Sequence, residues 1–274
     1  MSIADQFRAS ADFQIKETDA SRKLLGAVAS GAENGKAIDK LQAVVLAEKI
    51  AKLQDVFIAA HEAKLLVILQ GMDTAGKDGT VKGVFGQIHP LGARTVAFKA
   101  PSKTETDHDY LWRVHKEVPG KGEIVIFNRS HYEDVLISQV HGWIDDAECL
   151  RRYAQIGDFE RMLSETGTVV LKFFLHISKD EQKSRLEERL ADPDKHWKFD
   201  PQDTAERVYW DEYQRAYEKA IRATDCSHAP WYIVPADSKT QRNLVIASIV
   251  LEKLESLNLR YPPGNLEYSK IKVV

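Results

Sequence analysis

The stretch KLLVILQGMDTAGKDGT, residues 64–80, decides the fold. It begins with an apolar run as long as a buried strand, breaks into a glycine loop, and continues from Val81 in a helical pattern. A loop that enters a helix directs several free backbone N–H groups, and the positive end of the helix dipole, at one place. The stretch therefore predicts a strand, a loop and a helix that together bind phosphate.

The glycines and the lysine of this stretch fit the phosphate loop (Walker A) of nucleotide-binding enzymes. Gly71 and Gly76 let the backbone approach phosphate oxygens, and Lys77 neutralises part of their charge. The other residues predicted to line the phosphate are Thr74, Ala75, Asp78, Gly79 and Thr80.

Two acidic residues depart from the usual loop. Asp78 stands where the pattern has a Ser or Thr hydroxyl that holds magnesium. Either Asp78 or Thr80 therefore holds the magnesium ion, or residues elsewhere in the chain hold it. Asp73 would repel a bound phosphate unless a cation lay between them. We interpret Asp73 as a magnesium ligand, and the alternative is that it caps the helix.

Composition limits the classes of function. The chain has 274 residues, of which 43% are hydrophobic and 29% charged, as in an ordinary globular protein with one large domain. A net charge of −3 argues against a nucleic-acid or membrane partner, so an anionic substrate must meet a local cluster of cations. Two cysteines without metal-ligand spacing suggest reduced thiols and a cytoplasmic location. We expect no signal peptide and no membrane span.

The two ends of the chain differ from its middle. Residues 1–38 are polar and Gly/Ala-rich, so we expect a flexible arm or a contact for another subunit. Residues 39–63 have the apolar spacing of one long amphipathic helix, and together with the arm they suggest a homo-oligomer. Residues 261–274 form a tail without periodicity. The main domain is thus expected over residues 39–260.

Strands and helices alternate through this domain. Further strands are predicted at residues 94–98, 123–127, 168–176 and 231–234, with helices between them. This alternation predicts an α/β fold with a parallel sheet, in which the carboxyl ends of the strands face the ligand crevice. Lys103 follows the second strand and is either a substrate contact or a solvated surface residue.

A polar motif, NRSHYED, follows the third strand at residues 128–134. Phosphate-loop enzymes commonly hold magnesium with a carboxylate at this position. Asn128 offers an oxygen without charge, so Glu133 or Asp73 should supply the negative charge. Ser130 and Glu133 also match a helix capping box, and because a carboxylate has two oxygens, Glu133 can be a cap, a metal ligand or both.

A lid is predicted at about residues 178–222. The helix that opens at Ser178 carries Arg185 and Arg189 on one face, and it leads into DPDKHWKFDPQD, a charged, aromatic segment interrupted by prolines. One long helix is expected from Pro201 onward. The two arginines either face the crevice or lie on a solvated surface.

Four segments in this order resemble the family-2 polyphosphate kinases over about residues 40–260. They are GMDTAGKDGTVK, FNRSHYEDVL, SRLEERLADPDKHWKFDPQD and APWYIVPADSK. The resemblance implies a P-loop fold like that of thymidylate kinase, with a parallel sheet between helices and a helical lid. It also implies phosphoryl transfer between inorganic polyphosphate and nucleotides, with Mg²⁺ or alternatively Mn²⁺. The form NRSHYED resembles class III, which accepts nucleoside mono- and diphosphates.

The resemblance assigns roles residue by residue. The implied catalytic residues are Asp73, Lys77, Asn128, Arg129, Glu133 and Arg189, and Asp73, Asn128 and Glu133 are the implied metal ligands. Lys82 and Arg185 are weaker matches for phosphate binding. The implied reaction converts AMP to ADP and ADP to ATP by direct, in-line transfer. The alternatives are an ATP-dependent nucleotide kinase and a non-catalytic nucleotide-binding P-loop protein, the latter suggested by Asn128.

Overall fold

A parallel sheet with strand order β2-β3-β1-β4-β5 forms the centre of the computed structural model, which describes residues 2–265, 267–268 and 271. β1 lies in the middle, and its residues Leu65 to Leu69 are fully buried because helices cover both faces of the sheet. The strands of this sheet are β1 (Lys64–Gln70), β2 (Ala93–Ala97), β3 (Ile124–Asn128), β4 (Thr168–His176) and β5 (Trp231–Pro235).

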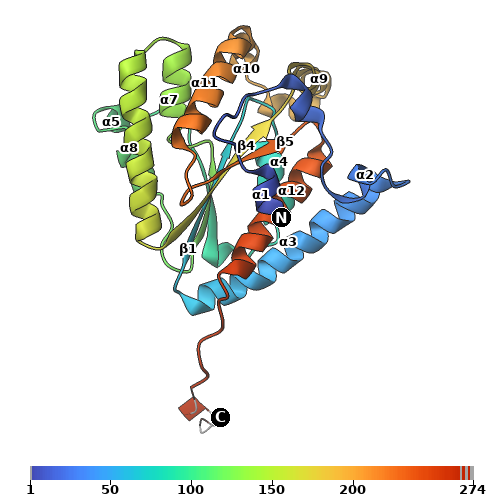
Figure 1. Cartoon of the computed structure of the whole chain (residues 1–274), viewed down its shortest axis with the longest axis vertical. Helices are drawn as coiled ribbons and strands as arrows, with labels where there is room; N and C mark the ends of the chain where they lie inside the picture. The colour runs from blue at the N-terminus through green and yellow to red at the C-terminus, as the bar shows by residue number, and fades with distance from the viewer. Residues whose placement is uncertain (1, 266, 269–270, 272–274) are drawn as a thin grey trace.

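Two layers of helices enclose the sheet (Figure 1). α3, α4 and α12 pack together on one face, and α7, α8 and α11 pack on the other. The predicted α/β fold with a parallel sheet between helices is therefore confirmed. The bounds of these helices are α3 (Gly35–Ala60), α4 (Lys77–Phe85), α7 (Glu133–Val140), α8 (Asp146–Glu165), α11 (Trp210–Thr224) and α12 (Lys239–Ser256).

The strand order brings two predicted motifs to one edge. β1 pairs with β3 in parallel, with Leu69 opposite Asn128, so the glycine loop and the NRSHYED motif leave the sheet side by side. Short helices lie in the connections: α5 (Lys103–Thr106) and α6 (Trp112–His115) between β2 and β3, and the 3-10 turn η2 (Pro90–Gly92) before β2.

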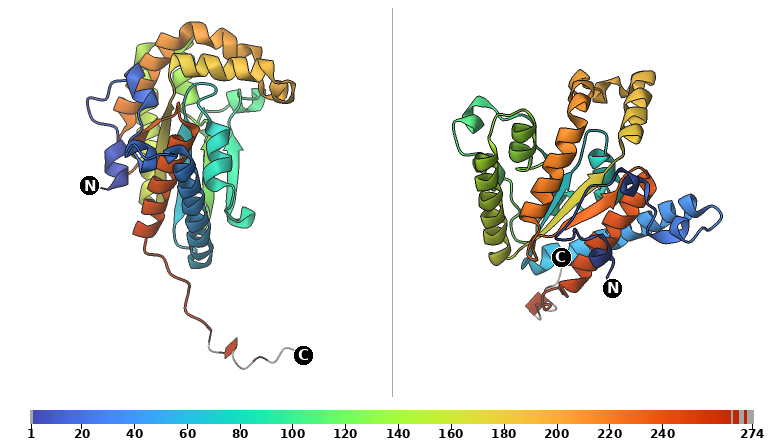
Figure 2. Two further views of the ribbon diagram at one scale, coloured as in Figure 1. Left: turned by 90° about the vertical axis from the view of Figure 1, so that its right-hand side faces the viewer. Right: turned by 45° about the horizontal axis from the view of Figure 1, so that its top comes forward.

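The segment between β4 and β5 lies at the same end of the molecule as the carboxyl ends of the strands (Figure 2). It contains α9 (Lys179–Ala191), η3 (Pro193–Lys198), α10 (Pro201–Ala205) and η4 (Glu206–Tyr209) ahead of α11. The single long helix predicted from Pro201 is wrong, because the 3-10 turn η4 breaks it. This turn places Glu206 where it accepts hydrogen bonds from Tyr213 (2.8 Å) and contacts His141 (3.1 Å).

The N-terminal residues are packed against the domain, contrary to the expected flexible arm. α1 (Ile3–Phe7) lies beside α12 and β5, Phe7 is buried, and the Ala9 amide donates to the Trp231 carbonyl (2.9 Å). η1 (Glu17–Ser21) and α2 (Gly26–Ala29) continue the segment to α3. The segment is packed and not flexible because its apolar side chains, such as Phe7, are buried against the core.

Other expectations about the ends stay predictions. The boundaries at residues 38 and 260 are among them, and part of the predicted tail, at residues 266, 269–270 and 272–274, lies outside the described residues. Self-association also stays a prediction, and the exposed apolar side chains of Ile38, Leu41 and Val45 on α3 are consistent with it. Among the described residues, the model contains no helix long and apolar enough to cross a membrane.

The packed arm gives a stability prediction. We expect Phe7→Ala to lower the free energy of unfolding by about 3 kcal/mol, because it deletes a buried aromatic ring. The control is Leu91→Ala, which removes an apolar side chain that is 90% exposed and should change stability by less than about 0.5 kcal/mol. Urea unfolding followed by circular dichroism measures both, and equal values for the two variants would show that the arm is loose in solution.

Candidate active site

The glycine loop winds tightly between β1 and α4. Gly71, Thr74 and Gly76 have φ angles of 151°, 63° and 104°, and a Cβ atom on Gly71 would lie 2.6 Å from the Leu175 carbonyl oxygen. This close approach requires glycine at position 71. The Lys77 ammonium group is buried beneath the loop and donates to the carbonyl of Gly71 (2.7 Å). Burial, and then the charge of Arg129, lower the pKa of Lys77.

The first turn of α4 separates the two residues considered for metal binding. Thr80 is fully buried, and its hydroxyl donates back to the Gly76 carbonyl (3.1 Å). Asp78 is exposed and accepts a hydrogen bond from the Asn128 side chain (2.6 Å). Asp78 therefore faces the other candidate ligands, whereas Thr80 belongs to the helix. Gly76 is the N-cap of α4 and no side chain caps it, so Asp73 does not cap this helix.

Arg129 connects the glycine loop to the NRSHYED motif. Its backbone is left-handed, with φ of 64°, and its guanidinium lies 2.5 Å from a carboxylate oxygen of Asp73 and 4.0 Å from one of Glu133. The structure thus brings Asp73, Arg129 and Glu133 together from three elements. Burial raises the pKa of Glu133, although the charges of Arg129 and Lys77 oppose this shift.

The capping box predicted for Ser130 and Glu133 does not form. α7 begins at Glu133 itself, and the Ser130 hydroxyl accepts instead from the Tyr132 amide (3.2 Å). The side-chain amide of Gln70 donates to a Glu133 carboxylate oxygen (3.0 Å). Glu133 is therefore held at the edge of the sheet by Gln70 and Arg129, and its carboxylate faces the cavity described next.

A cavity of about 170 Å³ lies between the sheet edge and the lid segment. The sheet edge contributes Asp73 and Arg129, and α7 contributes Glu133 and Ile137. The lid segment contributes Asp200, Gln202, Asp203, Glu206, Tyr213 and Tyr217. Carboxylates outnumber cations in this lining, so a phosphate-bearing ligand needs accompanying cations to enter it.

The lid arginines have different surroundings. Arg189 donates to the Lys198 carbonyl (3.1 Å) and to a carboxylate oxygen of Asp203 (3.3 Å), which lines the cavity. Arg185 is buried below the loop, where it donates to the carbonyls of Thr74 (2.9 Å) and Ala236 (2.8 Å). The structure therefore places Arg185 as a support of the loop from beneath, and not in the cavity where we predicted it to bind phosphate.

Two predicted lysines lie away from the cavity. Lys82 is exposed farther along α4, and Lys103 is exposed at the start of α5. Neither belongs to the described residues that line the cavity.

The sequence and the fold of the chain match those of known proteins. A family model described as polyphosphate kinase 2 matches residues 33–262. The chain belongs to this family. Two solved structures resemble it: polyphosphate kinase 2 from Arthrobacter aurescens TC1 (TM-score 0.92, 42% identity, 98% of this chain and 95% of that one) and putative polyphosphate kinase 2 from Pseudomonas aeruginosa PA01 (TM-score 0.77, 31% identity, 83% and 49%).

Two curated relatives are similar over most of their length. The AMP/ADP-polyphosphate phosphotransferase of Meiothermus ruber is 48% identical over 244 residues, which cover 89% of this chain and 91% of that protein. The ADP-polyphosphate phosphotransferase of Rhodopseudomonas palustris is 42% identical over 227 residues, or 78% of each chain. The match therefore spans the glycine loop, the NRSHYED motif and the lid segment of this polyphosphate kinase 2 family member.

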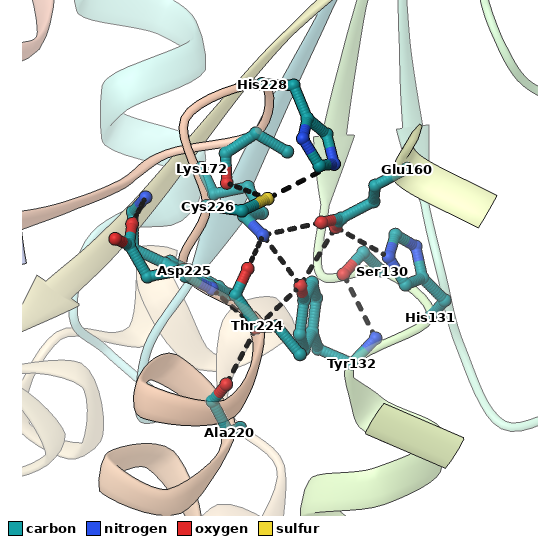
Figure 3. A network of polar contacts seen from close by, with 12 residues as sticks. Ser130, His131, Tyr132, Glu160, Lys172, Ala220, Thr224, Asp225, Cys226 and His228 are labelled. Carbon is teal, nitrogen blue, oxygen red and sulfur yellow. Dashed lines mark hydrogen bonds and ion pairs between the residues drawn. The ribbon is translucent and has the colours of Figure 1, made fainter. Parts of the chain in front are cut away.

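A buried polar network lies behind the NRSHYED motif (Figure 3). Glu160 of α8 contacts the Nε2 atom of His131 (3.2 Å), accepts from the Tyr132 hydroxyl (2.9 Å) and pairs with Lys172 of β4 (2.5 Å). Lys172 also donates to the Thr224 carbonyl at the end of α11 (2.9 Å). The side chains of this network are buried, and the most exposed of them, Thr224, is only 3% exposed. Although burial opposes it, the charge of Lys172 holds the pKa of Glu160 below its usual value.

This network connects two walls of the cavity. His131 and Tyr132 point into the core, whereas Arg129 and Glu133 on either side of them reach the cavity. α11, whose last residue Thr224 joins the network, carries the cavity residues Tyr213 and Tyr217 on its other turns. The network therefore holds the loop of the motif and α11 at a fixed position relative to each other.

Sequence reasoning missed the cavity residues that the lid segment contributes, and one support of the loop. Asp203, Tyr213 and Tyr217 line the cavity, and Arg242 of α12 donates to the Ala75 carbonyl (3.2 Å). Asp203 lies in the DPQD part of the predicted lid, and its acidic pattern was the available signal. A lone arginine in an amphipathic helix offers no comparable signal.

The buried ion pair gives a prediction about stability. Lys172→Met should cost about 3–5 kcal/mol of unfolding free energy, because it leaves Glu160 charged, buried and unpaired. The double variant Lys172→Met with Glu160→Gln removes both charges and keeps an acceptor for Tyr132, so it should recover about half of that loss. Urea titration tests this, and equal losses in both variants would show that pairing of the charges is not the cause.

The lid carboxylate gives a prediction about pH. Burial, and then the charge of Asp73, raise the pKa of Asp203 to about 6 from 3.8, so ionisation of Asp203 opposes folding. Asp203→Asn should therefore raise the free energy of unfolding by about 1 kcal/mol at pH 8. This gain should shrink as the pH falls through about 6 and vanish below 3.8, where the carboxyl is neutral in both states. Thermal melts at pH 8, 6 and 3.5 measure it; a gain independent of pH would contradict the assignment.

Proposed function

We propose that the protein transfers phosphoryl groups from inorganic polyphosphate to nucleoside mono- and diphosphates, converting AMP to ADP and ADP to ATP. The observation that supports this most is the edge where the glycine loop, Asn128, Arg129 and Glu133 meet beneath a lid that carries Arg189. Relatives named for polyphosphate transfer to AMP and ADP support the choice of substrates, and the NRSHYED motif supports class III.

The geometry supports direct transfer. The α4 dipole and the loop N–H groups bind one phosphate chain, and Lys77 neutralises charge beside them. In this structure Arg129 pairs with Asp73, and Arg189 pairs with Asp203. A phosphate group carries more negative charge than a carboxylate, so it can replace both carboxylates as the partner of the guanidinium groups. Positioning and charge neutralisation then provide the rate, because phosphoryl transfer requires little covalent chemistry from the protein.

The acidic residues fit a magnesium ion that the substrate helps to bind. Among the described residues, no three His, Cys, Asp or Glu side chains are arranged to hold a metal by themselves. Magnesium, however, is usually held by one or two carboxylates together with water and substrate phosphates. Asp73 and Glu133, with the Asn128 oxygen, would hold the ion in this way, and the ion would neutralise phosphate charge. Mn²⁺ and a cytoplasmic location stay predictions.

The first experiment mixes purified protein with long-chain polyphosphate, AMP and magnesium, without ATP, and follows nucleotides by chromatography. Formation of ADP and then ATP supports the proposal, and chelation of magnesium should stop both. If polyphosphate phosphorylates neither AMP nor ADP, but ATP serves as a phosphoryl donor, the protein is an ATP-dependent nucleotide kinase. Tight nucleotide binding without turnover of any donor would favour a non-catalytic P-loop protein.

The lid role of Arg189 can be separated from stability. Arg189→Ala should lower turnover with polyphosphate by about 100-fold or more, because the charge that meets the transferred phosphate is lost. It should change the unfolding free energy by less than about 1 kcal/mol, since the side chain is partly exposed. Arg215→Ala, on the exposed side of α11, is the matched control and should change neither quantity. An equal collapse of activity and stability in Arg189→Ala would count against the lid role.

A further inference from the structure

Arg242 lies directly beneath the glycine loop. It belongs to the first turns of α12, its side chain is buried, and its Nη1 atom donates to the Ala75 carbonyl (3.2 Å). A Cβ atom built on Gly76 would lie 1.7 Å from Nη1, and one built on Gly79 would lie 2.9 Å from Nη2. The guanidinium group therefore packs against the loop and the first turn of α4, where the predicted phosphate site begins.

The charge of Arg242 has no counter-ion in the part of the chain that the structure describes. No carboxylate oxygen of these residues pairs with it, and its other N–H groups donate to the neutral side chain of Asn243 (3.2 and 2.9 Å). Burial, and then the charge of Arg185, lower the pKa of Arg242 to about 9. An unpaired buried charge opposes folding, so packing alone does not account for a cation here.

Arg185 provides a comparison within the same structure. It is also buried under the loop and also reaches the Ala75 carbonyl (3.3 Å), but its Nε atom lies 2.8 Å from a carboxylate oxygen of Glu181. The two arginines thus share a carbonyl and a degree of burial. They differ in that a carboxylate pairs with Arg185, which also donates to the carbonyls of Thr74, Ala236 and Asp237. The loop also contains the buried Thr74 hydroxyl, which has no hydrogen-bond partner among the described residues.

We propose that the counter-ion of Arg242 is the phosphate group bound by the glycine loop. Arg242 is then an electrostatic positioning residue: it acts through the loop backbone, raises the positive potential of the phosphate site, and does not touch the substrate. The inference rests on the proposed function, because it requires that the loop binds phosphate. A neutral donor could satisfy the Ala75 carbonyl equally well, so the charge itself must serve the ligand.

Two variants separate the effect of the Arg242 charge from the effect of its hydrogen bond to the Ala75 carbonyl. Arg242→Gln removes the charge and keeps an N–H donor for Ala75, whereas Arg242→Lys keeps the charge and loses the planar group. Isothermal titration with tripolyphosphate and with ADP, both in magnesium, measures binding to the full chain. We expect Arg242→Gln to weaken binding by about tenfold and to raise the KM for polyphosphate more than it lowers kcat, and Arg242→Lys to recover most of the affinity.

Stability without ligand provides the second measurement, with Arg185→Gln as the matched control. Arg242→Gln should leave the melting temperature unchanged or higher, because an unpaired buried charge is removed. Arg185→Gln should lower it, because it removes an ion pair with Glu181 and hydrogen bonds to the carbonyls of Thr74, Ala236 and Asp237. Equally tight binding by Arg242→Gln and wild type would overturn the inference. So would a loss of stability in Arg242→Gln as large as that in Arg185→Gln.

The inference and the proposed function fail in different ways. If the wild-type protein binds ADP but not tripolyphosphate, the polyphosphate function is contradicted. In that case a tenfold loss of ADP affinity in Arg242→Gln still supports the role of Arg242. A wild type that binds both ligands, with Arg242→Gln unchanged toward both, overturns the role of Arg242 and leaves the proposed function standing.

Discussion

The structure depends on how the carbonyl groups of the glycine loop are satisfied. The loop belongs to no helix or strand, so its buried carbonyls require donors from elsewhere. Lys77 donates to Gly71 and Met72, Arg185 to Thr74 and Ala75, and Arg242 to Ala75. Three cations from α4, α9 and α12 thus hold the loop from its carbonyl side, and the Ala75 N–H donates within the loop to the Met72 carbonyl (3.1 Å).

This arrangement explains why helices distant in the sequence converge on one turn. α9 follows β4 and α12 follows β5, and both strands lie on the same side of β1 in the sheet. A right-handed parallel topology returns each helix to the sheet near the β1–α4 loop, where its first turns can reach the loop carbonyls. The sheet order is therefore a condition for binding anions at the loop, as well as for a buried core.

Much of this could be read from the sequence, because the signals are local. The run at residues 64–70 is one continuous apolar strand, and it has the predicted bounds in the structure. β4 likewise has its predicted bounds. The approach of Asp73 to Arg129 and Glu133 was also expected, since parallel strands place their carboxyl ends at one edge.

The parts that could not be predicted depend on side-chain direction and on contacts distant in sequence. Arg185 and Arg189 share a helix face, yet the first donates to the loop carbonyl of Thr74 and the second, one turn later, to Asp203 of the lid segment. The Ser130–Glu133 pattern fits a capping box, but α7 begins a few residues later than that box requires. Helical spacing alone cannot distinguish these outcomes.

The carboxylates of the cavity would make the proposed lid depend on its substrate. Asp73 pairs with Arg129 and Asp203 pairs with Arg189. Burial, and then the negative charge of Asp73, raise the pKa of Asp203, so the two acids also repel each other across the cavity. Under the proposed function, a polyphosphate chain bound together with magnesium would change both relations at once: phosphate would compete for the arginines, and the metal would give the carboxylates a partner. A single phosphate without metal satisfies only one side. The acidic lining thereby favours a metal-bound phosphate over a free one, although the protein as a whole carries a net negative charge.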